Sequence, residues 1–211
     1  MNIAVKVMCC AAFAGTLPML VGAGTTTLAD GWMFRLEGET EMRPVRVPHD
    51  WGVEKGFLPV KSCPGNGDLP FAGKGFYRRR FDGFTPPEGG RIYLTLDGVQ
   101  CRSVVKLNGR VVGGRPFGYA SETIDVTDSL RPKGNVLEVE AENMLASSRW
   151  YSGSGIFRDV TVEVCPPDHV KPNTLFVRTL AATEREARVA VSFEWRGGVS
   201  NFEFTVENPR L

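Results

Sequence analysis

The segment whose side chains could do the most specific chemistry begins at Arg149, Trp150 and Tyr151. Pyranose rings present patches of C–H groups that aromatic faces can cover, and their hydroxyl groups need fixed donors such as a guanidinium. These three side chains therefore predict a place of sugar contact. Packing between two domains explains the same residues, because large aromatic side chains and arginine are also enriched at interfaces.

Histidine and cysteine are too sparse for most independent active sites. The two histidines, His49 and His169, lie far apart in the sequence, and the cysteines never show the close spacing of a zinc clamp. A serine or cysteine nucleophile would lack a partnered histidine, and Gly65-Asn66-Gly67 lacks the lysine and following helix of a phosphate loop. We expect no metal site and no cofactor.

The charge balance argues against a nucleic-acid partner. The chain has 25 lysine and arginine residues against 24 acidic ones, a net charge of +1, without a block of like charge. Binding to phosphate backbones needs clustered cations. With 42% hydrophobic residues, the composition is that of an ordinary globular protein.

The N-terminus predicts an export signal over residues 1–23. Lys6 precedes an apolar run over residues 7–21, and Val21-Gly22-Ala23 suits signal cleavage. We therefore expect a secreted or periplasmic protein. The alternative of a membrane span is disfavoured, because the run falls short of the roughly 20 apolar residues that cross a bilayer.

Lipidation at Cys9 or Cys10, which lie within this run, is a second option. After cleavage, Cys63, Cys101 and Cys165 would remain, enough for one internal disulfide at most.

Short segments with alternating apolar residues, separated by Gly, Pro and Asn, predict an antiparallel β-sandwich. The clearest segments are residues 91–97, 135–141 and 160–164, each with one apolar face. Asn108-Gly109 between two valine-rich segments predicts a hairpin with a type I′ turn. Around residues 125–130 we expect a corner with a short helical turn that Thr127 caps.

Two further segments favour structural roles. In Pro48-His49-Asp50-Trp51, the proline predicts an extended entry, Asp50 can bond nearby backbone, and Trp51 buries a large ring. Residues 75–81 alternate rings with arginines and predict a strand on which Tyr77 packs beside a guanidinium. Arg158 and Asp159 suggest an ion pair on a strand.

Pro166-Pro167 predicts a linker, since consecutive prolines stiffen the chain and cannot donate ladder hydrogen bonds. Beyond it, residues 175–180, 188–195 and 201–207 predict three more strands. An immunoglobulin-like sandwich needs about seven strands, so these would be only its first part.

Taken together, several motifs resemble the N-terminal sugar-binding domain of family 2 glycoside hydrolases of the beta-galactosidase type. They are residues 149–160, Pro48-His49-Asp50-Trp51, Gly75-Phe76-Tyr77-Arg78-Arg79, Asn108-Gly109 and Gly118-Tyr119. The resemblance implies an all-β chain, with a galactose-binding-like jelly roll over residues 28–165 and a truncated immunoglobulin-like sandwich over residues 168–211. It also implies a galactoside-like glycan as ligand, and it places Arg149, Trp150 and Tyr151 near the active-site mouth.

The same resemblance implies that catalysis happens elsewhere. Retaining glycosidases need two carboxylates about 5 Å apart, and in this family both are glutamates on a later barrel, the acid/base following an asparagine. This chain ends at Leu211 and contains no Asn-Glu dipeptide. Glu138, Glu140, Glu142 and Glu163 are explained as solvated side chains on the outer faces of strands.

We therefore expect a non-catalytic N-terminal portion of a glycosidase, inactive alone, whose partner is the catalytic barrel domain of the parent enzyme. Two alternatives stay open. One is a stand-alone secreted carbohydrate-binding module, and the other is a structural subunit that complements a separate catalytic chain.

Overall fold

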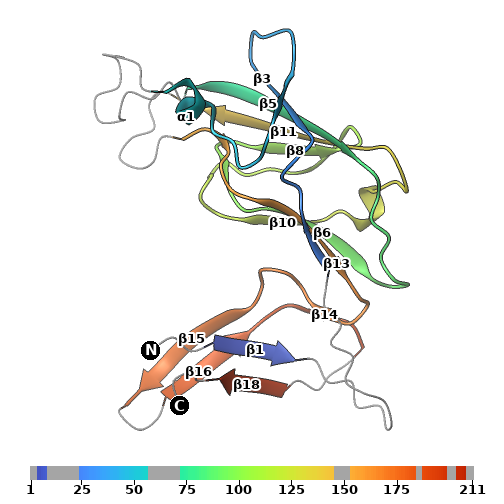
Figure 1. Cartoon of the computed structure of the whole chain (residues 1–211). Coiled ribbons are helices and arrows are strands. Elements are labelled where there is room, and N and C mark those ends of the chain that lie inside the picture. Colours follow the sequence, from blue (N-terminus) through green and yellow to red (C-terminus); the bar gives the residue numbers. More distant parts are fainter. Residues whose placement is uncertain are drawn as a thin grey trace. The chain divides into compact units, whose positions relative to one another are not determined.

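The computed structural model describes residues 24–56, 72–144, 153–183 and 187–198 in full, and the backbone alone of residues 4–8 and 203–207. The chain forms two compact units (Figure 1). The sandwich unit comprises residues 24–86 and 91–164, and the second unit comprises residues 1–23, 87–90 and 165–211. Within the described residues no helix is long and apolar enough to cross a membrane.

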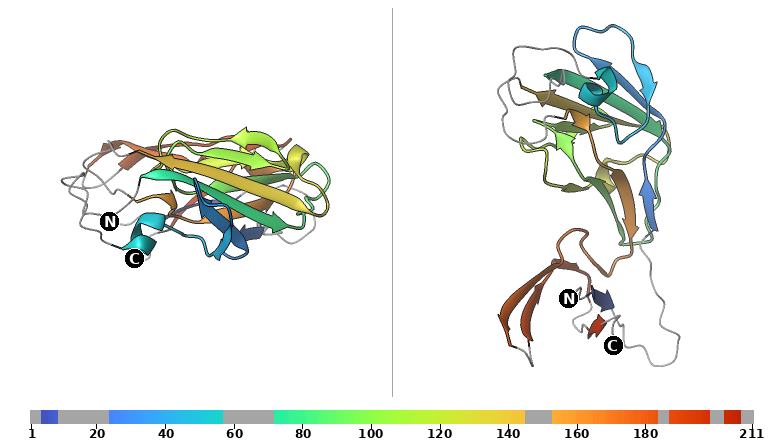
Figure 2. Two further views of the ribbon diagram at one scale, coloured as in Figure 1. Left: turned by 90° about the horizontal axis from the view of Figure 1, so that it is seen from above. Right: turned by 60° about the vertical axis from the view of Figure 1, so that its left-hand side comes forward.

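Two antiparallel sheets form the layers of the sandwich unit (Figure 2). The six-stranded sheet has the order β4 (Arg43–Val45), β3 (Trp32–Leu36), β5 (Gly73–Phe81), β11 (Asn135–Asn143), β8 (Val104–Leu107) and β9 (Arg110–Gly113). The four-stranded sheet has the order β10 (Glu122–Asp125), β6 (Arg91–Leu96), β13 (Val160–Cys165) and β2 (Gly24–Thr27). A short pair, β7 (Val99–Gln100) and β12 (Gly155–Ile156), lies beside them. The chain is thus all-β with a sandwich architecture, as predicted.

Alternation along the strands produces the core between the sheets. Every second residue of β11, from Asn135 to Asn143, is buried, because successive side chains of a strand point to opposite faces. β6 and β13 supply the facing layer with Ile92, Leu94, Leu96, Val160 and Val162. Tyr93 departs from the predicted pattern of one apolar face: it alternates with Ile92 and Leu94 along β6, yet only 1% of its surface is exposed.

The predicted hairpin is confirmed between β8 and β9. Asn108 and Gly109 have φ angles of 54° and 82°, the left-handed conformation that a type I′ turn requires at both positions. The predicted cap is wrong. Thr127 lies inside the 3-10 helix η1 (Thr127–Ser129), and its hydroxyl instead accepts a hydrogen bond from the Ile92 backbone N–H at 2.9 Å.

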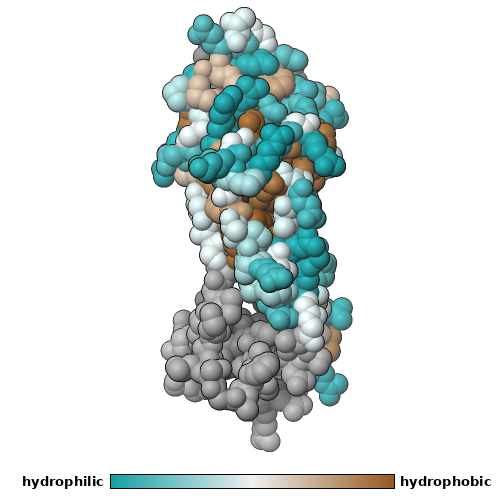
Figure 3. Space-filling view, turned by 90° about the vertical axis from the view of Figure 1, so that its right-hand side faces the viewer, coloured by the Kyte–Doolittle hydropathy of each residue, from teal (hydrophilic) through white to brown (hydrophobic). Residues whose placement is uncertain are grey.

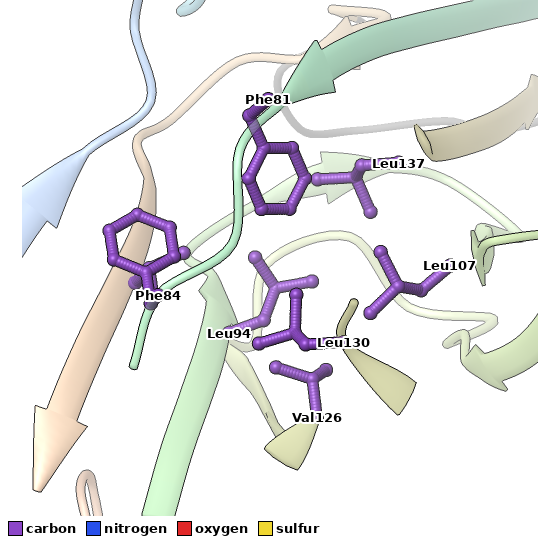
Figure 4. Close-up of a pocket in the computed structure, with 8 residues that line it drawn as sticks. Phe81, Phe84, Leu94, Leu107, Val126, Leu130 and Leu137 are labelled. Atoms are coloured by element: carbon purple, nitrogen blue, oxygen red, sulfur yellow. The ribbon is translucent and has the colours of Figure 1, made fainter. Parts of the chain in front are cut away.

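On one face of the sandwich unit, hydrophobic residues are visible at the surface between hydrophilic ones (Figure 3). An opening between its sheets is lined only by apolar residues: Phe81, Phe84, Leu94, Leu107, Val126, Leu130, Leu137 and Val162 (Figure 4). Its free volume of about 10 Å³ is roughly what a single water molecule needs. The opening is therefore a packing gap and too small for an organic ligand.

The second unit pairs β15 (Phe176–Ala182) with β16 (Ala187–Ser192), β14 (His169–Val170) with β17 (Trp195–Arg196), and β1 (Ala4–Met8) with β18 (Glu203–Glu207). On β16, Val189 is 43% exposed. On β15, Phe176 is 60% exposed.

Candidate functional site at one end of the sandwich

The predicted sugar-contact residues Arg149, Trp150 and Tyr151 lie outside the described residues, so their role stays a prediction. The structure describes the chain on either side of them, as far as Met144 and from Gly153 onward. Met144 and Gly153 therefore mark the positions between which the chain containing these three residues runs.

Asn143 joins the two ends of that segment. Its side-chain amide donates to the Gly153 carbonyl at 2.9 Å and to the Ser154 hydroxyl at 3.0 Å. Its Oδ1 accepts from the backbone N–H of Met144 at 2.9 Å. Asn143 and Ser154 are almost fully buried, at 2% and 0% exposure. Because a buried amide must be hydrogen-bonded, Asn143 fixes the separation of the two ends.

Sequence reasoning missed Asn143, although a signal was present. It continues the inward-facing register of Leu137, Val139 and Ala141 on β11. A polar residue at an inward position of a strand must find partners inside the protein. The predicted strand stopped at Ala141, two residues too early.

The returning chain at β12 packs against the Pro48–Trp51 motif. Gly155 has a φ of +102°, and a Cβ there would stand only 2.1 Å from the Tyr77 hydroxyl oxygen. The His49 backbone N–H donates to the Ile156 carbonyl at 2.7 Å. Only glycine allows so close an approach of backbone to side chain.

A short helix follows the motif, which the sequence reading did not predict. In α1 (Trp51–Lys55), Asp50 is the N-cap, and its Oδ1 accepts from the backbone N–H groups of Gly52 and Val53 at 2.8 and 3.2 Å. The expected bond from Asp50 to nearby backbone is thereby confirmed. Trp51 is completely buried, also as expected.

Gly75 makes room for the Trp51 ring. A Cβ at Gly75 would lie 2.5 Å from the Trp51 ring and 2.8 Å from Phe34. Phe34 itself stacks on Trp51, with ring centroids 5.8 Å apart and an interplanar angle of 18°. Gly75, in the motif on β5, therefore leaves the space that the Trp51 ring of the Pro48–Trp51 motif occupies.

His49 connects α1 to the core. Its Nδ1 lies 2.7 Å from the Tyr77 hydroxyl, its Nε2 lies 3.2 Å from Glu54 Oε2, and its ring packs on Phe34 with centroids 4.6 Å apart. Arg43 forms an ion pair with the same Glu54 oxygen. A chain of polar contacts thus runs from Arg43 to Tyr77.

The proton positions in this chain follow from Glu54. Its pKa is lowered, so it is an ionised carboxylate, which can only accept hydrogen bonds. His49 Nε2, 3.2 Å away, is therefore the protonated ring nitrogen and donates to Glu54. In the neutral imidazole Nδ1 is then the acceptor, and the Tyr77 hydroxyl donates to it.

Burial decides the charge states. Desolvation lowers the pKa of His49, although its hydrogen bond to Glu54 acts in the other direction. Burial also raises the pKa of Tyr77. For Glu54, burial opposes ionisation, but hydrogen bonds from Arg43 and His49 outweigh it and lower the pKa. The neutral imidazole therefore bridges a neutral phenol and a carboxylate.

Gly118 and Tyr119 reach the same end of the sandwich. A Cβ at Gly118 would stand 2.1 Å from Gln100 Oε1, and Gln100 pairs with Gly155 in the β7–β12 ladder. The ring centroids of Tyr119 and Phe157 lie 5.8 Å apart. Most of the motifs quoted for the resemblance therefore meet within one end of the unit.

The Asn108-Gly109 turn lies at the opposite end. Asn108 donates from its side chain to the Ser129 carbonyl and to Asn135 Oδ1, at 2.8 and 2.9 Å. Asn135 begins β11, whereas Asn143 ends it. The two asparagines are the ends of this nine-residue strand and lie roughly 26 Å apart, from a rise of about 3.3 Å per residue. This turn is structural and does not belong to the candidate site.

The outer face of β5 differs from expectation. Tyr77 is buried in the core, and no arginine among the described residues lies over its ring. On the outer face, the Arg35 guanidinium lies 4.3 Å from the centroid of the Phe76 ring. Arg78 pairs across strands with Glu138 at 2.9 Å, and Lys74 pairs with Glu140 at 3.2 Å.

Two pairs of charged side chains lie on β11 and next to β12, respectively. Glu138 and Glu140 are ion-paired with neighbouring strands in addition to being partly solvated. No ion pair joins Arg158 to Asp159; the Arg158 guanidinium instead lies 5.3 Å from the centroid of Phe157.

In the part of the chain that the structure describes, no three His, Cys, Asp or Glu side chains gather as metal ligands do.

The fold and the converging motifs define an antiparallel β-sandwich, which comparison with known proteins assigns to a family. No family model matches the chain. It is 37% identical over 166 residues to a beta-galactosidase of Bacteroides ovatus, which covers 76% of this chain and 19% of that protein.

Solved structures agree. A beta-glycosidase from Bacteroides vulgatus matches with a TM-score of 0.69 and 28% identity over 84% of this chain and 25% of its own. A glycosyl hydrolase family 2 member from Bacteroides cellulosilyticus matches with a TM-score of 0.61 and 26% identity, over 80% of this chain and 24% of its own. The chain belongs to glycoside hydrolase family 2, and it spans about a fifth to a quarter of the length of these three relatives.

Proposed function

We propose that this chain forms the N-terminal, non-catalytic portion of a family 2 glycosidase that hydrolyses O-glycosidic bonds, with a galactoside-like glycan as substrate. In this proposal residues 28–165 are the sugar-binding jelly roll, and residues 168–211 are the first part of an immunoglobulin-like domain. The catalytic barrel domain of the parent enzyme is the partner. Residues 1–23 direct the protein out of the cytoplasm.

The observation that carries this proposal is the pair of hydrogen bonds from the buried Asn143 amide to Gly153 and Ser154, which we call the Asn143 clamp. It supports a role for the segment containing Arg149, Trp150 and Tyr151, because both ends of that segment are fixed by buried hydrogen bonds. Two contacts tie the same place to the corner around His49, namely the His49–Ile156 hydrogen bond and the packing of Gly155 on Tyr77. An end of the sandwich built this rigidly suits a positioned binding loop.

Hydrolysis tests the non-catalytic part of the proposal. The purified 211-residue chain is incubated with chromogenic beta-galactoside and beta-glucuronide, and we expect no turnover. Turnover that persists through purification, and that disappears when one of its carboxylates is replaced, would contradict it.

Binding tests the predicted contact residues. Trp150→Ala should weaken binding of a galactoside by about tenfold, since a stacked aromatic ring contributes about 1 kcal/mol or more. Trp195→Ala, in the second unit, is the control and should leave binding unchanged. Equal affinity of the Trp150→Ala variant and the unaltered chain would remove the segment from the site.

A further inference from the structure

Three aromatic side chains form a continuous strip beside β7 and β12. Phe117 contacts Tyr119 with ring centroids 5.5 Å apart, and Tyr119 contacts Phe157 with centroids 5.8 Å apart. The rings are inclined to each other by 49° and 60°. We call Phe117, Tyr119 and Phe157 the aromatic strip.

The aromatic strip is partly open to solvent, since Phe117 is exposed and Tyr119 and Phe157 are half-buried, and its backbone is firmly held. Phe117 is 57% exposed. The Arg102 backbone N–H donates to the Pro116 carbonyl at 3.2 Å, and Gly118 presses on Gln100 so closely that a Cβ would not fit. At the other end, the Phe157 ring lies over Gly98, where a Cβ would stand 2.8 Å from it. The three rings are therefore pre-positioned.

Three exposed arginines accompany the strip. Arg158 lies over the Phe157 ring, and Arg102 and Arg115 belong to the two segments whose backbones pair beside Phe117. Among the described residues none of the three forms an ion pair. Two carboxylates in the surrounding loops have other partners: Asp97 accepts from the Ser121 hydroxyl at 2.5 Å, and Glu122 accepts from the Gly114 N–H at 2.9 Å. Asp159 forms no ion pair with any residue that the structure describes.

Exposed aromatic rings next to guanidinium groups without carboxylate partners are a chemically specific combination. Aromatic faces cover the C–H patches of a pyranose, as already argued for residues 149–151. A guanidinium presents paired N–H donors that match a carboxylate in geometry and charge. A sugar that carries a carboxylate would use both features at once.

We propose that the aromatic strip and Arg158 bind an acidic sugar unit of the glycan, extending the sugar-binding end beyond the Arg149–Tyr151 segment. The inference rests on the proposed function, because it takes carbohydrate as the ligand. It adds a second place of contact, on the other side of β12 from His49, and a preference for a negatively charged sugar.

The test is calorimetry on the full 211-residue chain with three tetrasaccharide probes: tetragalacturonate, its neutral galactose counterpart and a sulfated galactose tetramer. Tetragalacturonate should bind about tenfold more tightly than the neutral probe, the size expected of one charge-assisted contact. Its advantage should shrink as the salt concentration rises. Tight binding of the sulfated probe alone would assign the anion to sulfate rather than carboxylate and overturn the carboxylate preference.

Two variants locate the site. Phe117→Ala should weaken binding of tetragalacturonate about tenfold, and Arg158→Gln should abolish the preference for the acidic probe while neutral binding persists. Phe176→Ala and Arg188→Gln are matched controls, because they alter an exposed phenylalanine and an exposed arginine in the second unit. Both controls should bind like the unaltered chain.

The outcomes separate this inference from the proposed function. Binding that Trp150→Ala abolishes and Phe117→Ala leaves intact would overturn the strip alone. If no probe binds, the inference that the aromatic strip binds an acidic sugar is also overturned. The absence of hydrolysis by the same preparation would then still support the non-catalytic part of the proposed function. Phe117-dependent self-association in sedimentation experiments, without sugar binding, would assign the strip to protein contact and reject the inference.

Discussion

The Asn143 side-chain amide donates to the Gly153 carbonyl at 2.9 Å, so one buried residue at the end of β11 ties down the chain that returns into β12. A second bond from the same amide reaches Ser154 at 3.0 Å. Both bonds come from the amide nitrogen, which a carboxylate of the same shape would lack.

Asn143→Asp should therefore destabilise the protein by about 1–3 kcal/mol, because Asp keeps the size but leaves buried acceptors facing a carboxylate. Ser154→Ala removes only one of the two bonds and should cost less. Urea denaturation of each variant measures the difference. Unchanged stability of Asn143→Asp would show that the clamp is not made in solution.

Gly75→Ala should cost about 1–3 kcal/mol, or more, because the new methyl group has no space beside the Trp51 ring. Intrinsic tryptophan fluorescence should also change as Trp51 moves. Gly24→Ala, on a strand where a Cβ meets nothing within 4 Å, is the control and should be close to neutral. A neutral Gly75→Ala would mean that Trp51 packs differently.

Stability should fall as the pH drops from 7.5 to 5.5. The folded-state pKa of His49 lies below its ordinary value of 6.5, so the unfolded chain binds the proton first and is favoured as the pH falls through this window. A single such group limits the slope to about 1.4 kcal/mol per pH unit.

His49→Gln removes the titrating group and should flatten the slope over the same range, where the lowered pKa of Glu54 keeps that carboxylate ionised. Chemical denaturation at several pH values gives the slope directly. An identical pH dependence in the variant would assign the effect to another residue.

Gly109→Ala should destabilise the hairpin by about 1–2 kcal/mol, the cost of a left-handed conformation for a residue with a Cβ. Gly109→Asn should recover part of the loss, because asparagine tolerates positive φ far better. Thermal unfolding of the two variants, compared side by side, checks the order. Equal loss in both would mean that the turn changes type.

Local pattern predicted the strands with clear alternation and the Asn108-Gly109 turn of the sandwich unit, but not β2, β3, β4 or β10. Alternation placed Ile92, Leu94 and Leu96 in the core, because a strand has a period of two. It failed at Tyr93, which is buried on the opposite side, since burial depends on what covers a face and not on the strand alone. The helix α1 also escaped it, because five residues are too few to show a helical period.

The sequence by itself determined the β class, the type I′ turn at Asn108-Gly109 and the family resemblance, because these depend on neighbouring residues and on motif order. Only the tertiary structure decided that Gly75 serves Trp51, that Asn143 holds Gly153, and that Phe117, Tyr119 and Phe157 line up. Those relationships join residues far apart in the chain, and their distances exist only once the strands have paired.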